Sequence, residues 1–180
     1  MKKLKIDLGE LAVAFETDMS MVGEGGSYLD TQTGEVVMLS GELSFSLDDF
    51  GEDEGAGSEN EVAAFETWLD TCNLPDWQKE QARTLYEIDR DENKRYVAVP
   101  LIDSHEGYQQ MVEFTQTVND EHLLELLRVA LNGRGAFRRF KDVLADHSPE
   151  ERARWFAFKD ERVKEEMLDW LRTLDIEPLE

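Results

Sequence analysis

Apolar residues near the start of the chain first recur at helical spacing and then follow an extended pattern. The helical positions are Leu8, Leu11, Ala12 and Phe15. Asp7, followed by Glu10 three residues later, is typical of a capping pattern, so the spacing predicts a short helix that ends near residue 17. Two extended segments within 27–39 then flank a turn that closes on Gly34, and this arrangement predicts a β-hairpin.

Two further segments read as strands. Residues 43–47 alternate between apolar and polar side chains, and residues 95–99 form an apolar run that Pro100 closes. Together with the hairpin they predict a small antiparallel sheet of three or four strands.

From residue 61 onward the apolar spacing becomes mainly helical. The expected helices begin near residue 61, after Pro75, after Asp103, at Asn119 or Asp120, after Gly135 and after Ser148. Three of the faces predicted to be buried are Trp77–Gln81–Leu85–Ile88, Phe137–Phe140–Leu144 and Phe156–Val163–Met167–Trp170–Leu174. The pattern as a whole predicts an α+β fold: a small antiparallel sheet near the N-terminus packed on a predominantly helical C-terminal half. At 180 residues, the chain is expected to form a single domain over residues 1–180.

Charge adds an acidic background to this picture. The chain holds 41 acidic and 19 basic residues, a formal net charge of -22. Eight of the acids and no cation fall in 42–61, and we predict that residues 48–60 form a mobile acidic linker. A calcium loop is excluded because Asp48-Asp49-Phe50-Gly51-Glu52 lacks the alternating ligand spacing that such a loop requires.

Residues capable of chemistry are few and scattered. The single cysteine, Cys72, has no neighbouring cation or base in sequence, and His105, His122 and His147 show no metal-binding spacing. We therefore predict no catalytic residue, no metal and no cofactor.

No window is apolar for long enough to cross a bilayer, and cysteine usage fits a reducing compartment, so the expectation is a cytoplasmic protein without a membrane contact.

One basic segment is the exception in this acidic chain. Residues 133–142 contain four cations and two phenylalanines. The glycines at 133 and 135 bracket a turn into a helix, whose first N–H groups favour anions. The predicted anion or partner contacts are Arg134, Gly135, Arg138, Arg139, Lys141, Arg152 and Arg154. The competing interpretation is that these cations pair within the molecule, Arg138 with Asp142 at helical spacing and others with Glu150, Glu151 or the acidic N-terminal part.

Several of these segments also resemble a known bacterial group. They are Tyr28-Leu29-Asp30, Gly34-Glu35-Val36-Val37, Arg95-Tyr96, Gly135 through Asp142, Arg154 through Phe158, and Ile176-Glu177-Pro178. In these segments the chain resembles uncharacterised protein family 158. The resemblance implies no established activity and transfers no catalytic residue.

The sequence supports three functional hypotheses. The first is a non-catalytic binding or regulatory module that contacts an unknown protein or a phosphate-bearing ligand through the arginines. Nucleic acid is disfavoured as that ligand by the net charge. The second is an acidic nucleic-acid mimic that binds a partner protein through residues 42–61. The third is a phosphate-ester enzyme of unrecognised type, which requires a pocket beside Gly135.

Overall fold

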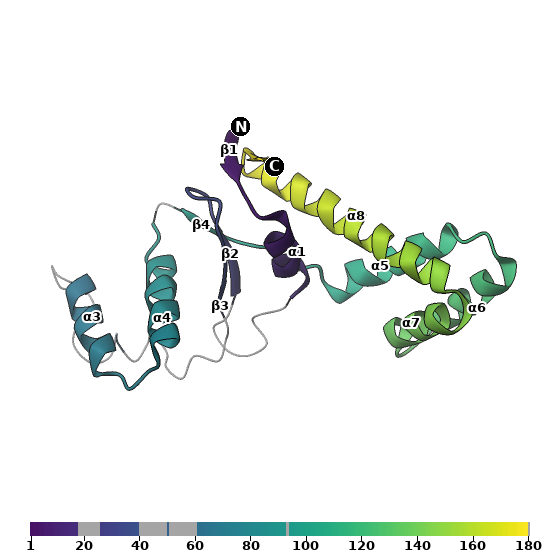
Figure 1. Ribbon diagram of the computed structural model, residues 1–180, viewed down its shortest axis with the longest axis horizontal. Coiled ribbons are helices and arrows are strands. Elements are labelled where there is room, and N and C mark those ends of the chain that lie inside the picture. The colour runs from purple at the N-terminus through teal and green to yellow at the C-terminus, as the bar shows by residue number, and fades with distance from the viewer. Residues whose placement is uncertain (18–25, 40–49, 51–60, 93, 180) are drawn as a thin grey trace.

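The computed structural model describes residues 1–17, 26–39, 50, 61–92 and 94–179. Its elements are β1 (Lys2–Lys5), α1 (Leu8–Glu16), β2 (Gly26–Asp30), β3 (Val36–Leu39), α3 (Glu61–Thr71), α4 (Asp76–Asp89), β4 (Tyr96–Ala98), α5 (Ser104–Gln116), α6 (Glu121–Leu131), α7 (Ala136–His147), α8 (Pro149–Thr173) and β5 (Ile176–Leu179). Figure 1 shows α3 and α4 at one end, the sheet and α1 in the middle, and α5, α6 and α7 at the other end, with the long helix α8 running from the middle to that far end. The predicted α+β class is confirmed.

The antiparallel sheet has the strand order β3-β2-β4. Leu29 of β2 lies opposite Val36 on one side and Val97 on the other. The hairpin turn needs glycine at Gly34, because φ is +84° there and an added Cβ would lie 2.4 Å from the carbonyl oxygen of Lys5. The predicted hairpin and the strand near 95–99 are thus confirmed. The strand expected at 43–47 lies outside the described residues.

A second, parallel strand pair joins the two ends of the chain and was not predicted from the sequence. β1 pairs with β5 from Lys2 opposite Ile176 to Lys5 opposite Leu179. A pairing between segments so far apart leaves no local turn signal, and the lysines of β1 mask its strand pattern. Leu4 and Ile176 are the residues of this pair that face the core.

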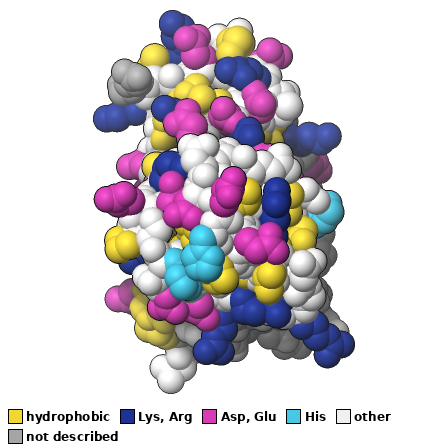
Figure 2. Space-filling view, turned by 90° about the vertical axis from the view of Figure 1, so that its right-hand side faces the viewer, with side chains coloured by type: hydrophobic (Ala, Val, Ile, Leu, Met, Phe, Trp, Pro, Cys, Tyr) yellow, Lys and Arg dark blue, Asp and Glu magenta, His cyan; other side chains and the backbone are white. Residues whose placement is uncertain are grey.

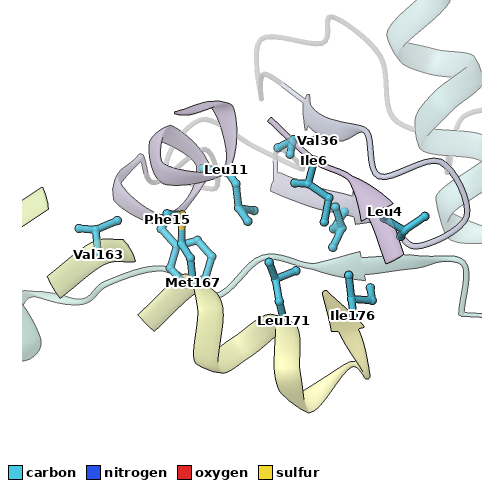
Figure 3. Close-up of a cluster of buried hydrophobic side chains, with 11 residues drawn as sticks. Leu4, Ile6, Leu11, Phe15, Val36, Val163, Met167, Leu171 and Ile176 are labelled. Atoms are coloured by element: carbon cyan, nitrogen blue, oxygen red, sulfur yellow. The ribbon is translucent and has the colours of Figure 1, made fainter. Parts of the chain in front are cut away.

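The central core forms where β1, β5, α1 and the second half of α8 meet. Figure 3 shows Leu11 and Phe15 of α1 directed toward Met167 and Leu171 of α8. Leu11 and Leu171 are completely buried. Burial of these side chains fixes the C-terminal half of α8 against the N-terminal strand and helix.

Two more hydrophobic clusters lie at the ends of the molecule. In the helical end, the buried residues are Met111, Phe114, Val118, Leu123, Leu127, Leu131, Phe140, Leu144 and Trp155. In the opposite end they are Phe50, Phe65, Leu69, Ala82 and Tyr86. Phe50 is only 3% exposed, so this residue of the expected mobile linker 48–60 belongs to a core instead; the rest of that segment lies outside the described residues.

Three predicted helix faces were confirmed at Leu85, at Phe140 and Leu144, and at Val163 and Met167, but each was wrong at one aromatic residue. Trp77 on α4, Phe137 on α7 and Phe156 on α8 were expected to be buried, but they are 49%, 41% and 46% exposed. The buried faces are instead Gln78–Ala82–Leu85–Tyr86, Ala136–Phe140–Leu144 and Trp155–Val163–Met167–Leu171. One residue turns the side chain by about 100° on a helix, so an adjacent aromatic can satisfy the sequence pattern and still face solvent.

Candidate anion-binding face

The turn between α6 and α7 sets the position of the basic segment. α6 ends at Leu131 with Asn132 as its C-cap, and Gly133 and Gly135 both adopt positive φ, at +81° and +77°. An added Cβ on either glycine would meet nothing within 4 Å, so glycine is needed there for its backbone conformation rather than for space. The turn leaves Arg134 exposed between the two helices.

The cations of α7 lie on its solvent side. Figure 2 shows Lys and Arg side chains gathered along the lower edge of this end of the molecule. Arg138 Nε lies 3.6 Å from Asp142 Oδ2, with the two side chains 89% and 61% exposed. An exposed pair of this kind contributes at most about 1 kcal/mol and leaves Arg138 open to other partners. Arg139 donates to the carbonyl oxygen of Asn132, which is neutral and does not cancel the charge.

Arg134 and Lys141 make no ion pair with the residues that the structure describes. The intramolecular pairing of Arg138 with Asp142, anticipated as the competing interpretation, is therefore present but does not extend to the whole segment.

The two arginines from α8 differ from each other. Arg154 donates to Glu151 Oε1 at 2.6 Å and to the carbonyl oxygen of Thr117 at 2.8 Å, and it lies over the ring of Phe114. It therefore fastens the start of α8 to the end of α5. Arg152 stacks on the ring of Phe156, 5.5 Å from its centroid, and remains exposed. Both side chains are exposed, but Arg154 is paired with Glu151, as the competing interpretation expects, whereas Arg152 has no carboxylate partner among the described residues.

A hollow lies next to these cations, between α5, α7 and α8. Its volume is about 340 Å³, and Phe137, Lys141, Trp155 and Phe156 are part of its lining. A second hollow of about 240 Å³ shares Lys141, Trp155 and Phe156 with the first and extends to Arg152. We call the two together the aromatic furrow. The furrow joins two exposed phenyl rings to the cationic side of α7.

Gly107 of α5 forms part of the furrow floor. A Cβ at this position would lie 3.2 Å from Cε1 of Phe137, so the absence of a side chain allows the ring to rest against α5. Gly107 could not be predicted as a site residue from the sequence, since a glycine inside a helix gives no signal of which ring it contacts. The only available sign was its position within a helical pattern, where glycine costs about 1 kcal/mol relative to alanine.

Most of the acidic side chains that line the furrow already bind other groups of the protein. Lys159 donates to Glu16, and Asp142 pairs with Arg138. Backbone N–H groups of Glu106 and His105 donate to Asp103 and hold the pKa of this carboxyl below its usual range. Asp103 thereby caps α5. Lys141 and Arg152 in the furrow lining, and Arg134 and Arg139 in the basic segment, have no carboxylate partner among the described residues.

The remaining candidate residues do not form a site. His122 and His147 lie with ring centroids 6.2 Å apart, and both are exposed. In the described ranges, no three side chains of His, Cys, Asp or Glu are grouped so as to hold a metal ion. Gly135 is not in the lining of the furrow. Nor does any helix in the described part of the chain have the length and apolar character needed to cross a membrane.

The fold defines an α+β protein whose small sheet is joined to a larger set of helices, and the basic segment lies in the helical end. The chain belongs to the uncharacterised protein family UPF0158, whose sequence pattern matches residues 66–180 and so includes the whole furrow except Glu16. It is similar to a UPF0158 protein of Pseudomonas aeruginosa, with 25% identity over 178 residues, which are 99% of this chain and 88% of the relative. No solved structure matches the chain. The family resemblance seen in the sequence is confirmed.

Proposed function

We propose that this protein is a non-catalytic binding module that holds an anionic ligand against the cationic side of α7. The observation that carries the proposal is the exposure of Arg134, Arg138 and Lys141 next to one another in a chain of net charge -22. Only Arg138 has a described carboxylate within 4 Å, in a pair that is exposed on both sides.

The start of α7 adds to this positive potential. Its N-cap, Gly135, makes no side-chain cap bond, and its first turn contains no acid. The starts of α1, α5, α6 and α8 are capped by Asp7, Asp103, Asp120 and Ser148. The partial positive charge of an uncapped helix start therefore acts in the same direction as the arginines.

The acidic remainder of the chain does not cancel such a face. Exposed charges separated by more than about 8 Å are largely screened at physiological salt, so an outside anion responds mainly to the nearest side chains. Arg134, Gly135, Arg138, Lys141 and Arg152 are the contacts that we favour. Arg139 and Arg154 already bind the Asn132 carbonyl and Glu151, so we assign them a smaller part.

The test is charge reversal with a matched control. We expect Arg138→Glu with Lys141→Glu to weaken binding of a fluorescein-labelled polyglutamate peptide at least about tenfold, because each reversal replaces attraction by repulsion. The control is Lys164→Glu with Arg172→Glu on α8. Arg172 pairs with exposed Asp169 as Arg138 does with Asp142, and the net charge of the two variants is the same. Equal anisotropy titrations for both variants, with unchanged circular dichroism, would overturn the proposal.

A further inference from the structure

Resting on the proposed function, we propose that the ligand is an acidic peptide segment of a partner protein, anchored by one aromatic or large aliphatic side chain in the aromatic furrow. The carboxylates of the segment would face Lys141, Arg138 and Arg152. The side-chain anchor would lie between Phe137 and Phe156.

The two phenyl rings supply the first argument. Phe137 is 41% and Phe156 46% exposed, they belong to different helices, and both line the same hollow. Single exposed apolar residues are ordinary, but paired aromatic rings at the mouth of a hollow favour a contact that removes them from water. The buried indole of Trp155, 5% exposed, extends the apolar surface into the floor.

The size of the hollow supplies the second argument. At about 340 Å³ it is at the lower end of the range for ligand sites. It suits one large side chain rather than an extended cofactor. The side open toward Arg152 leaves room for the rest of a peptide to continue over α8.

Charge complementarity favours a peptide over a nucleic acid. Lys141 lines both hollows, and Arg152 lies on the ring of Phe156, so a carboxylate on either side of an anchor residue meets a cation. Asp142 and Glu16 also lie in the lining. They can accept hydrogen bonds from peptide N–H groups, which a phosphate backbone does not offer.

The experiment compares defined probes on the full chain. The first is a labelled twelve-residue Glu/Asp peptide with a central Phe, and the second has Ser in place of that Phe. A labelled single-stranded oligonucleotide of the same length is the third. We expect the Phe peptide to bind at least about tenfold more tightly than the Ser peptide. We also expect it to shift the emission of Trp155 in a variant whose other tryptophans are replaced by Phe.

Furrow variants identify the anchor site. Phe137→Ser should remove the preference for the Phe peptide while leaving affinity for the Ser peptide nearly unchanged. Phe156→Ser also removes the ring on which Arg152 stacks, so it should remove the preference and weaken binding of both peptides. Val129→Ser, at a position 61% exposed on α6, is the matched control and should retain the preference. If either Ser variant lowers the Tm, Gly107→Ala is the milder comparison: its Cβ would lie 3.2 Å from Cε1 of Phe137, so the ring must shift slightly, and the preference for the Phe peptide should weaken without loss of an apolar residue.

The outcomes separate the two proposals. Failure of both acidic peptides to bind would overturn the proposed function itself. Equal affinity for the Phe and Ser peptides would leave an anion-binding face and overturn the anchored peptide. Tighter binding of the oligonucleotide than of the Phe peptide would overturn it in favour of a nucleic-acid ligand.

Discussion

Asp30 shows how a single buried carboxylate organises the sheet. Its side chain is 2% exposed and accepts hydrogen bonds from the backbone N–H of Gln32 at 2.7 Å and from Arg95 Nε at 3.0 Å. Burial opposes ionisation, but the bonds from Arg95, Gln32 and Thr33 outweigh it and lower the pKa of Asp30 to about 2. Asp30, Gly34 and Arg95 are also among the residues on which the family resemblance rests. Their position together at the hairpin turn gives a structural reason for that part of the resemblance.

Replacing this carboxylate should destabilise the protein in a pH-dependent way. The pKa of Asp30 in the folded protein, about 2, lies below its ordinary value of 3.8. The ion pair therefore contributes fully above about pH 4, and its contribution is lost as the pH falls toward 2. We expect Asp30→Asn to lower the free energy of unfolding by about 2 kcal/mol at pH 7 and by clearly less at pH 3, since one pKa unit corresponds to about 1.4 kcal/mol.

Urea unfolding at the two pH values measures this difference. Asp142→Asn is the control, because its pair with Arg138 is exposed, and it should change stability by less than about 1 kcal/mol. An Asp30→Asn effect that is the same at pH 3 and pH 7 would contradict a role for the ionised carboxylate.

Among the helices, the starts were the features most readable from the sequence. Asp103 and Glu106 form the capping box that their spacing predicts, and the side chains of Asp7, Asp120 and Ser148 each accept a bond from the first turn of their helix. Caps depend on residues within four positions of each other, so the sequence alone contains the whole signal.

Features that join distant segments could not be read in this way. The parallel pairing of β1 with β5 leaves no local mark, and the burial of Phe50 depends on Phe65 and Tyr86. The candidate site shows the same limit. The sequence predicted the cations of α7, but the aromatic furrow requires α5, α7 and α8 to meet, and the adjacent aromatics at 155 and 156 gave no means to choose which one is buried.

The helices α3 and α4 should unfold locally before the rest of the chain. The Phe65 ring stacks on Tyr86 with centroids 3.9 Å apart, and their cluster shares no residue with the other two. Phe65→Ala, which removes a ring 1% exposed, should cost about 3–5 kcal/mol. We expect the loss to appear as faster hydrogen exchange of the amides in 61–89, with exchange in α5 to α8 unchanged.

Phe114→Ala, in the hydrophobic cluster at the opposite end of the molecule, is the matched comparison for Phe65→Ala. It should first accelerate hydrogen exchange of the amides in α5 to α8. Uniform acceleration along the whole chain in the Phe65→Ala variant would show instead that the clusters unfold as one unit.

On the scale of the whole molecule, the charge distribution affects both the stability of the fold and the proposed binding of an acidic peptide. The chain has a net charge of -22, while Arg138, Arg139 and Lys141 lie exposed on α7 at the helical end of the molecule (Figure 1). Repulsion among the acids opposes the compact state, whereas the proposed function requires that attraction at α7 favours an acidic partner. The two effects involve different residues but are both screened by salt.

Salt should therefore change stability and binding in opposite directions. The Debye length falls from about 10 Å at 0.1 M to about 3 Å at 1 M. We expect the Tm to rise between 0.1 M and 1 M NaCl because the self-repulsion of the chain is screened. The affinity for an acidic peptide should fall over the same range, because attraction to Arg138 and Lys141 is screened as well. Chloride is the salt to use, since sulfate also strengthens apolar burial and would raise the Tm by a second route.

The charge-reversed variant links the two measurements. Arg138→Glu with Lys141→Glu replaces two exposed cations by acids and increases the self-repulsion of the chain, so its Tm should lie below that of the wild type at 0.1 M NaCl and approach it at 1 M. Its residual peptide binding should lose most of the salt dependence seen in the wild type. Parallel salt curves for the two proteins in both measurements would mean that the cations of α7 are neutralised in solution. Both the proposed anion-binding face and the proposed acidic peptide ligand would then be contradicted.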